Sequence, residues 1–157
     1  MISLTIPGFN DHLTIEHLVL DFNGTLAEDG KLYAGLREIL NDLAKKVTIH
    51  ILTGNTFGTA EEELKNIACK VVALPTHQLG KEKEKYLQRL NPDTVLSIGN
   101  GRNDCLMLKA AAIGVIVVQR EGASAEALMA ADVICPDIFS ALELLNHPLR
   151  LVATLRN

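Results

Sequence analysis

Short apolar runs alternate with helix-like stretches along almost the whole chain, and this alternation predicts a parallel sheet covered by helices. The runs are rich in Val, Ile and Leu without strict alternation, as expected of strands that are buried on both faces. Six strands are predicted, at residues 17–20, 47–52, 70–74, 94–98, 113–118 and 133–134. The pattern therefore predicts an α/β protein with a three-layer α/β/α, Rossmann-like fold.

Helices are predicted between these runs, where apolar residues recur at a spacing of three or four. The stretch from Leu36 to Leu43 shows this spacing most clearly. Thr59 followed by Glu62 has the spacing of a capping box, and Asn103 is placed to cap a helix through residue 110. Further helices are expected at residues 124–130 and 139–145.

The order of these elements predicts a single domain over residues 1–157. Residues 2–6 and 13–15 predict a hairpin within an N-terminal extension, 1–16, that precedes the first core strand. The core is expected at residues 17–135, followed by C-terminal helices at 136–157. Residues 26–33 predict a second, short hairpin with Asp29 and Gly30 at its turn.

Composition narrows the class of protein. The 157 residues are 48% hydrophobic and 22% charged with a net charge of -4, so the chain is able to bury a core. Without a basic block, nucleic-acid binding is not expected. The longest apolar run, 110–118, is shorter than the roughly 20 residues of a membrane helix, and no secretory signal is recognisable, which favours a cytoplasmic protein. Three widely spaced cysteines predict neither disulfides nor a zinc site.

Polar residues gather where the predicted strands end, which is the edge where open α/β sheets bind ligands. Asp21 follows the first strand, Thr53 the second and a polar cluster at 99–104 the fourth, while Lys81 lies in the helix after the third. Each is ordinary as a turn or cap residue. Together they outline a phosphate site, with Asp21 as nucleophile, Thr53 and Lys81 on phosphoryl oxygens and Asp104 helping to hold a divalent metal.

Four stretches, in order, resemble the motifs of the haloacid dehalogenase (HAD) superfamily. They are LVLDFNGT from Leu18, ILTG from Ile51, Lys81, and GNGRND from Gly99. The last block and the Ala-rich stretch after it are most similar to the phosphorylation domain of P-type ATPases. The resemblance covers residues 18 to about 134 and implies a HAD-like fold and a phosphohydrolase (phosphatase) activity.

The resemblance also implies a role for each matching residue. Asp21 corresponds to a nucleophile that forms an aspartyl-phosphate, and Asn23 takes the place of the usual catalytic acid and base. The phosphoryl group is expected at Thr53 and Lys81, with Lys83 as the rival lysine at a less favourable spacing. The implied phosphate-binding residues are Phe22, Asn23, Thr53, Gly54 and Lys81, and the implied Mg²⁺ ligands are Asp21, Asn23 through its backbone carbonyl, Asn100 and Asp104.

Two asparagines depart from the family pattern, since Asn23 and Asn100 stand where the motifs carry aspartates. An amide exchanges no proton at neutral pH, so Asn23 is unable to protonate a leaving group. Asn100 still offers an oxygen to magnesium, but without the negative charge that strengthens the site. These departures keep open an alternative, a catalytically weakened module that binds phosphate or a phosphoprotein without turnover.

Neither gap between the motifs has room for a cap domain, so a capless relative is expected. Such relatives act on macromolecules or have the site covered by a neighbouring subunit, which predicts a homo-oligomer acting on a phosphorylated small molecule or a phosphoprotein. A two-component receiver domain is disfavoured because its phosphorylated Asp follows the third strand, where this chain has Leu74 and Pro75. His50, inside an apolar strand, is interpreted as a core residue, and Arg102 as either a substrate contact or a solvated loop residue.

Overall fold

A computed structural model describes residues 1–54 and 59–157. Its central sheet has six parallel strands in the order β10-β9-β8-β3-β6-β7, which confirms the predicted parallel sheet. Every strand lies within one residue of its predicted bounds. The strands are β3 (His17–Asp21), β6 (Thr48–Thr53), β7 (Lys70–Ala73), β8 (Val95–Gly99), β9 (Ile113–Val117) and β10 (Val133–Cys135).

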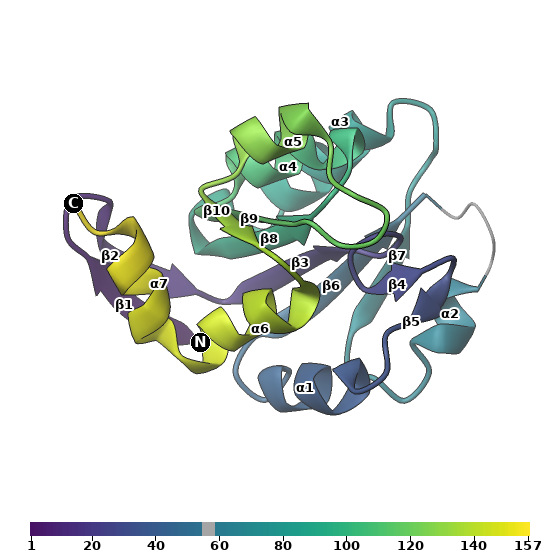
Figure 1. Ribbon diagram of the computed structural model, residues 1–157, viewed down its shortest axis with the longest axis horizontal. Helices are drawn as coiled ribbons and strands as arrows, with labels where there is room; N and C mark the ends of the chain where they lie inside the picture. Colours follow the sequence, from purple (N-terminus) through teal and green to yellow (C-terminus); the bar gives the residue numbers. More distant parts are fainter. Residues whose placement is uncertain (55–58) are drawn as a thin grey trace.

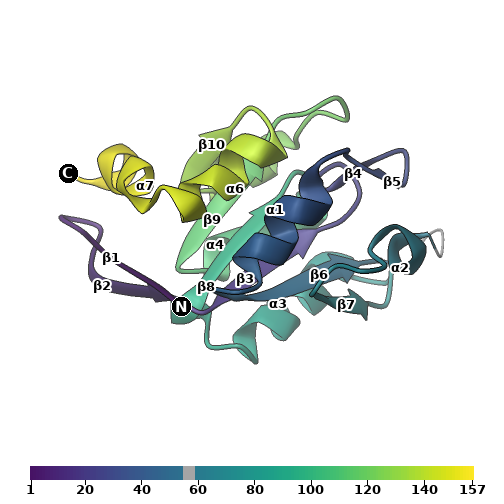
Figure 2. The ribbon, with the colours of Figure 1, turned by 90° about the horizontal axis from the view of Figure 1, so that it is seen from below.

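Helices cover both faces of this sheet and give the expected three layers (Figures 1 and 2). One face carries α1 (Leu36–Leu43) and α6 (Ile138–Asn146). The other carries α3 (Leu79–Gln88), α4 (Cys105–Ala110) and α5 (Ala125–Ala130). None of the helices among the described residues combines the length and the apolar composition needed to cross a bilayer.

The N-terminal hairpin packs against the C-terminal end of the chain. It consists of β1 (Ile2–Ile6) and β2 (Asn10–Ile15), which pair antiparallel, and α7 (Pro148–Leu155) lies beside it (Figure 1). The Asn157 N–H donates to the Pro7 carbonyl at 3.0 Å. Ile6, Leu13 and Ile15 are buried in the same hydrophobic core as the sheet. This shared core supports one domain over 1–157, which stays a prediction.

The sheet topology brings the ends of β3 and β8 together. From β3 the chain continues to β6 and β7 on one side, and then returns to β8 on the other side of β3. Leu20 pairs with Ile98 on β8, and Asp21 pairs with Leu52 on β6. A crevice forms where the order of strands reverses in this way. Asp21 therefore lies beside the position at which such sheets bind ligands.

Two predicted helix starts differ from the structure. Helix α2 is limited to Ala60–Glu63, and Thr59 has helical backbone angles and makes no side-chain cap hydrogen bond, so the expected capping box is absent. Asn103 lies in a 3₁₀ turn, Arg102–Asp104, and α4 begins only at Cys105. The turn is tight because the Asp104 side chain accepts backbone N–H groups from the residues before it.

A chain of polar side chains crosses the core between the sheet and α3. His17 Nδ1 lies 3.1 Å from His50 Nε2, and His50 Nδ1 lies 2.9 Å from the Tyr86 hydroxyl. His50 is 1% exposed, as expected of a core histidine with hydrogen-bond partners. Burial, with smaller contributions from His17 and Lys70, lowers the pKa of His50 to about 4.

Acid is therefore expected to destabilise the protein through His50. The unfolded chain binds a proton there below its ordinary pKa of about 6.5, whereas the folded chain does so only near 4, so stability is lost as the pH falls through this window. The expected loss is about 3 kcal/mol in the free energy of unfolding. Urea titrations from pH 7 to pH 4 should show a smaller pH dependence for His50→Gln, and equal dependence in both proteins would contradict the assignment.

Candidate active site

A cavity of about 730 Å³ opens at the carboxyl ends of β3, β6 and β8. The predicted second hairpin, formed by β4 (Ala27–Glu28) and β5 (Lys31–Leu32), lies at the same end of the sheet (Figure 1). We call residues 26–33 the flap. The residues lining the cavity are Asp21, Asn23, Asp29, Gly30, Thr53, Gly54, Thr59, Leu79, Asn100, Gly101, Asn103 and Glu121.

A buried lysine holds two carboxylates at the floor of this cavity. Lys83 Nζ donates at 2.6 Å to both Asp21 Oδ1 and Asp104 Oδ1, and at 3.1 Å to Asn103 Oδ1. Its side chain is 0% exposed. Three acceptors thus match the three N–H donors of the ammonium group, which fixes the position of the Asp21 carboxylate.

The lysine at the site is Lys83, and the preference for Lys81 is corrected. Lys81 is exposed and does not line the cavity. Two residues along an α-helix correspond to about 200° of rotation, so Lys81 and Lys83 point in nearly opposite directions. Lys83 shares its face with Leu79 and Leu87, each four residues away, and Leu87 is fully buried. This spacing relative to Leu79 and Leu87 is the sequence signal that would have identified Lys83, and the prediction did not use it.

Asp104 anchors the loop that follows β8 and does not form the cavity wall. Its Oδ2 accepts the backbone N–H groups of Asn100 at 3.0 Å and Gly101 at 2.8 Å, while Oδ1 accepts from Lys83. The side chain is fully buried. A Cβ at Gly99 would lie 2.5 Å from Asp104 Cγ, so this packing requires glycine there. The structure thus gives Asp104 an anchoring position below the cavity, and the expectation that it helps to hold a metal stays a prediction.

The charges at the floor influence one another strongly. Burial first and the nearby Asp104 carboxylate second raise the pKa of Asp21, Lys83 opposes both effects, and the resulting pKa of Asp21 is about 6. Burial lowers the pKa of Lys83, but the carboxylates of Asp21 and Asp104 outweigh it, so the net shift is upward. Lys83 therefore stays protonated and supplies positive charge beneath the cavity.

Asn100 is held with its amide oxygen toward Asp21. Thr25 Oγ1 donates to Asp21 Oδ2 at 3.1 Å and lies 3.4 Å from Asn100 Oδ1, while Asn100 Nδ2 donates to the Gly122 carbonyl at 3.1 Å. Gly24 has a φ of +80°, and a Cβ there would lie 2.3 Å from Asn100 Nδ2. Glycine at position 24 thus permits both the left-handed turn and the close approach of the amide.

The cavity wall offers oxygen donors that fit a magnesium ion. The carboxylate of Asp21, the amide oxygen of Asn100 and the backbone carbonyl of Asn23 are hard ligands of the kind that magnesium uses together with water. Among the described residues no three His, Cys, Asp or Glu side chains are grouped for a metal. A metal here would therefore depend on amide and carbonyl oxygens beside a single carboxylate.

Gln119, in the loop after β9, connects two parts of the site, although no sequence motif indicated it. Gln119 Nε2 donates to the carbonyls of Gly24 at 3.0 Å and Thr25 at 2.9 Å, and its Oε1 accepts from the Ile138 N–H at 2.9 Å. Gln119 therefore joins the turn after β3 to the start of α6. These bonds use main-chain groups, which any sequence provides, so residue identities gave no signal.

The remaining expected residues lie at or near the cavity in different ways. Thr53 and Gly54 line it at the end of β6. The Phe22 side chain is buried in the core at 1% exposure, so a phosphate contact from this residue would use its backbone. Arg102 is exposed and pairs with Glu126 at 2.9 Å, which favours the interpretation as a surface loop residue.

The fold agrees with solved HAD phosphatases, and no family model matches the chain. The 3-deoxy-D-manno-octulosonate 8-phosphate phosphatase of Moraxella catarrhalis, solved with magnesium, phosphate and KDO, superposes with a TM-score of 0.70 at 15% identity, covering 90% of this chain and 94% of that one. The cobalt-bound deoxy-D-mannose-octulosonate 8-phosphate phosphatase (YrbI) of Haemophilus influenzae superposes with a TM-score of 0.71 at 10% identity, covering 92% of this chain and 94% of that one.

The chain thus has the three-layer fold of the HAD superfamily, as its motifs predicted. By sequence it belongs to the same family as the uncharacterized protein MJ0073 of Methanocaldococcus jannaschii, to which it is 42% identical over 72 residues, 45% of this chain and 77% of that protein. The more specific similarity to the phosphorylation domain of P-type ATPases stays a prediction.

Proposed function

We propose that the protein is a magnesium-dependent phosphohydrolase that works through an aspartyl-phosphate at Asp21. The observation that carries the proposal is the arrangement of Asp21, which lines the cavity while its carboxylate is fixed by buried Lys83 at 2.6 Å. The solved neighbours support this class of reaction, since they are named as phosphatases. The substrate class is a phosphate monoester.

The proposed reaction has two displacements at phosphorus. An oxygen of Asp21 attacks, forms a bond to phosphorus, and the bond from phosphorus to the alcohol oxygen breaks. The alcohol oxygen leaves with the bonding electrons and takes a proton from water, because the Asn23 amide has none to give. Water then attacks the phosphorus of the acyl-phosphate, which releases inorganic phosphate and restores the Asp21 carboxylate.

Lys83 and the groups that line the cavity would together stabilise the negative charge of the phosphoryl group. Lys83 neutralises charge that develops on the phosphoryl oxygens and keeps Asp21 in line for attack. Thr53 and Gly54, which line the same cavity, would contact the same oxygens. A bound magnesium ion would neutralise phosphoryl charge. Asp21, Asn100 and the Asn23 carbonyl would hold it.

A second candidate function rests on the two asparagines. Without a carboxylate at Asn23 or Asn100, the site is suited to binding phosphate or a phosphoprotein with little turnover. This alternative predicts binding of beryllium fluoride or phosphate at the cavity with no release of product. It also places the protein in a regulatory class and not among enzymes.

Hydrolysis of p-nitrophenyl phosphate in the presence of magnesium separates the two functions. We expect measurable turnover by the natural chain and loss of at least about 10³-fold in Asp21→Asn, because an amide is no nucleophile for phosphorus. Asp42→Asn, an exposed aspartate on α1, is the matched control and should retain full activity. Equal turnover by Asp21→Asn and the natural chain would place the chemistry elsewhere.

A further inference from the structure

The mouth of the cavity carries two carboxylates that the proposed chemistry does not use. Asp29, at the turn of the flap, and Glu121, in the loop after β9, both line the cavity and are exposed. Glu121 Oε1 accepts the Asp29 N–H at 3.2 Å, so two loops that are far apart in the sequence meet at the cavity, with the Glu121 carboxylate against the backbone of Asp29. The part of a substrate beyond its phosphate would lie next to them.

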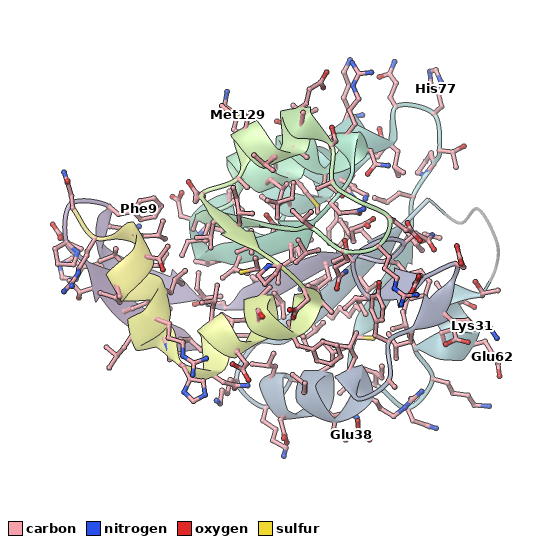
Figure 3. All side chains as sticks on the ribbon, viewed as in Figure 1. Phe9, Lys31, Glu38, Glu62, His77 and Met129 are labelled. Carbon is pink, nitrogen blue, oxygen red and sulfur yellow. The ribbon has the colours of Figure 1, made fainter. Side chains whose placement is uncertain are left out.

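No lysine or arginine among the described residues lines this cavity. Lys83 is fully buried below the floor, and Arg120, the neighbour of Glu121 in sequence, lies 3.4 Å from Glu28 in an ion pair. Figure 3 shows Lys31 at the outer edge of the molecule beside α2, and it does not line the cavity. Within the described part of the chain, neither Asp29 nor Glu121 forms an ion pair.

The electrostatic effect of these groups reaches a neighbouring side chain. The pKa of Tyr33, at the end of the flap, is raised first by burial and next by the carboxylates of Glu28 and Glu121, with Asp29 acting in the same direction. Arg120 opposes this effect without reversing it. The flap side of the cavity therefore presents negative potential to whatever enters it.

From this geometry we infer that the cavity selects a phosphate monoester whose alcohol portion carries a positive charge, such as an amino alcohol or amino sugar phosphate. Asp29 and Glu121 would pair with the ammonium group while the phosphate lies over Asp21 and Lys83. The same carboxylates repel an acidic alcohol portion, so the phosphate of a sugar acid is disfavoured. This inference rests on the proposed function and adds the substrate class to it.

Phosphoethanolamine and phosphoglycolate form a matched pair of probes, since they are similar in size and carry opposite charges on the alcohol portion. We expect the natural chain with magnesium to show a kcat/KM about tenfold higher for phosphoethanolamine, the effect of two exposed carboxylates that attract one probe and repel the other. The double variant Asp29→Asn with Glu121→Gln should bring this ratio close to one. Glu38→Gln, exposed on α1 in Figure 3, is the control and should leave the ratio unchanged.

The outcomes separate this inference from the proposed function. Turnover of both probes with equal efficiency, or a preference for phosphoglycolate, overturns the charge selection and leaves the phosphatase intact. Absence of turnover for both probes and for p-nitrophenyl phosphate overturns the phosphatase. In that case, calorimetric binding of the two probes to the magnesium-loaded protein and its double variant still decides the charge preference.

Discussion

Replacing Asn23 with aspartate is expected to raise the turnover of an alkyl phosphate by roughly 10² to 10⁴-fold, the usual contribution of general acid–base catalysis. Asn23 lines the cavity beside Asp21, and aspartate has nearly the same shape as asparagine. The new carboxyl group would protonate the departing alcohol and then activate the water that attacks the acyl-phosphate. Steady-state kinetics at saturating magnesium measures the gain.

The leaving group provides an internal check on this prediction. Nitrophenolate departs without a proton, so Asn23→Asp should speed the first displacement of p-nitrophenyl phosphate far less than that of an alkyl phosphate. Asn100→Asp is the matched control, because it adds the same charge to the same cavity. Its aspartate would lose the hydrogen bond to Gly122 and offer no proton to the alcohol, so no comparable gain is expected. Equal rates for Asn23→Asp and the natural chain would contradict the proposed role of position 23.

Replacing Lys83 with methionine is expected to lower the free energy of unfolding by about 3 to 5 kcal/mol, the cost of removing one partner from a buried ion pair. Asp21 and Asp104, both held by Lys83 at 2.6 Å, would face each other without a cation. The pKa of Asp21 would rise without the cation, so the deficit should grow as the pH increases and shrink in acid, where the Asp21 carboxylate is protonated. Phosphatase activity should be lost as well.

Lys81→Met is the matched control for this second prediction, since it makes the same chemical change two residues earlier on α3. Lys81 is exposed, and its replacement should change the free energy of unfolding by no more than about 0.5 kcal/mol. Urea titrations of both variants at neutral and acidic pH measure the free energy of unfolding. If Lys83→Met is unfolded at neutral pH, the titration at acidic pH still gives its value. Equal stability of the two variants would show that Lys83 does not hold the site together.

The sheet was predictable because strands covered on both faces leave a strong signal. Runs such as Ile113–Val117 are largely apolar, so hydrophobicity alone located every strand of the central sheet to within one residue, whereas β2 of the N-terminal hairpin begins three residues before its predicted start. The 3₁₀ turn before α4 was missed because it results from the side chain of Asp104 binding backbone groups. The spacing of apolar residues does not reveal hydrogen bonds between a side chain and the nearby backbone.

The residues of the candidate site were predictable from the sequence only where a chemically reactive or polar residue lies at the end of a predicted strand. Asp21 and Thr53 are the last residues of their strands and Asn100 directly follows a third, and the parallel sheet brings them together. The lysine was misassigned because distance along the sequence was given more weight than the face of the helix, although Lys83 lies four residues from both Leu79 and Leu87. Gln119 was missed because it acts on main-chain carbonyls from a loop without a motif.

The most direct measurement for the central claim is to trap the acyl-phosphate. Because position 23 lacks a base, hydrolysis of the phosphoenzyme should be slow and the intermediate should accumulate during turnover of p-nitrophenyl phosphate. Borohydride reduces an aspartyl-phosphate to homoserine, which peptide mass spectrometry identifies by position. Our account predicts homoserine at residue 21 and nowhere else, and its loss when substrate is omitted. Continued release of phosphate with unmodified aspartate at residue 21, or homoserine at another position, would contradict the account.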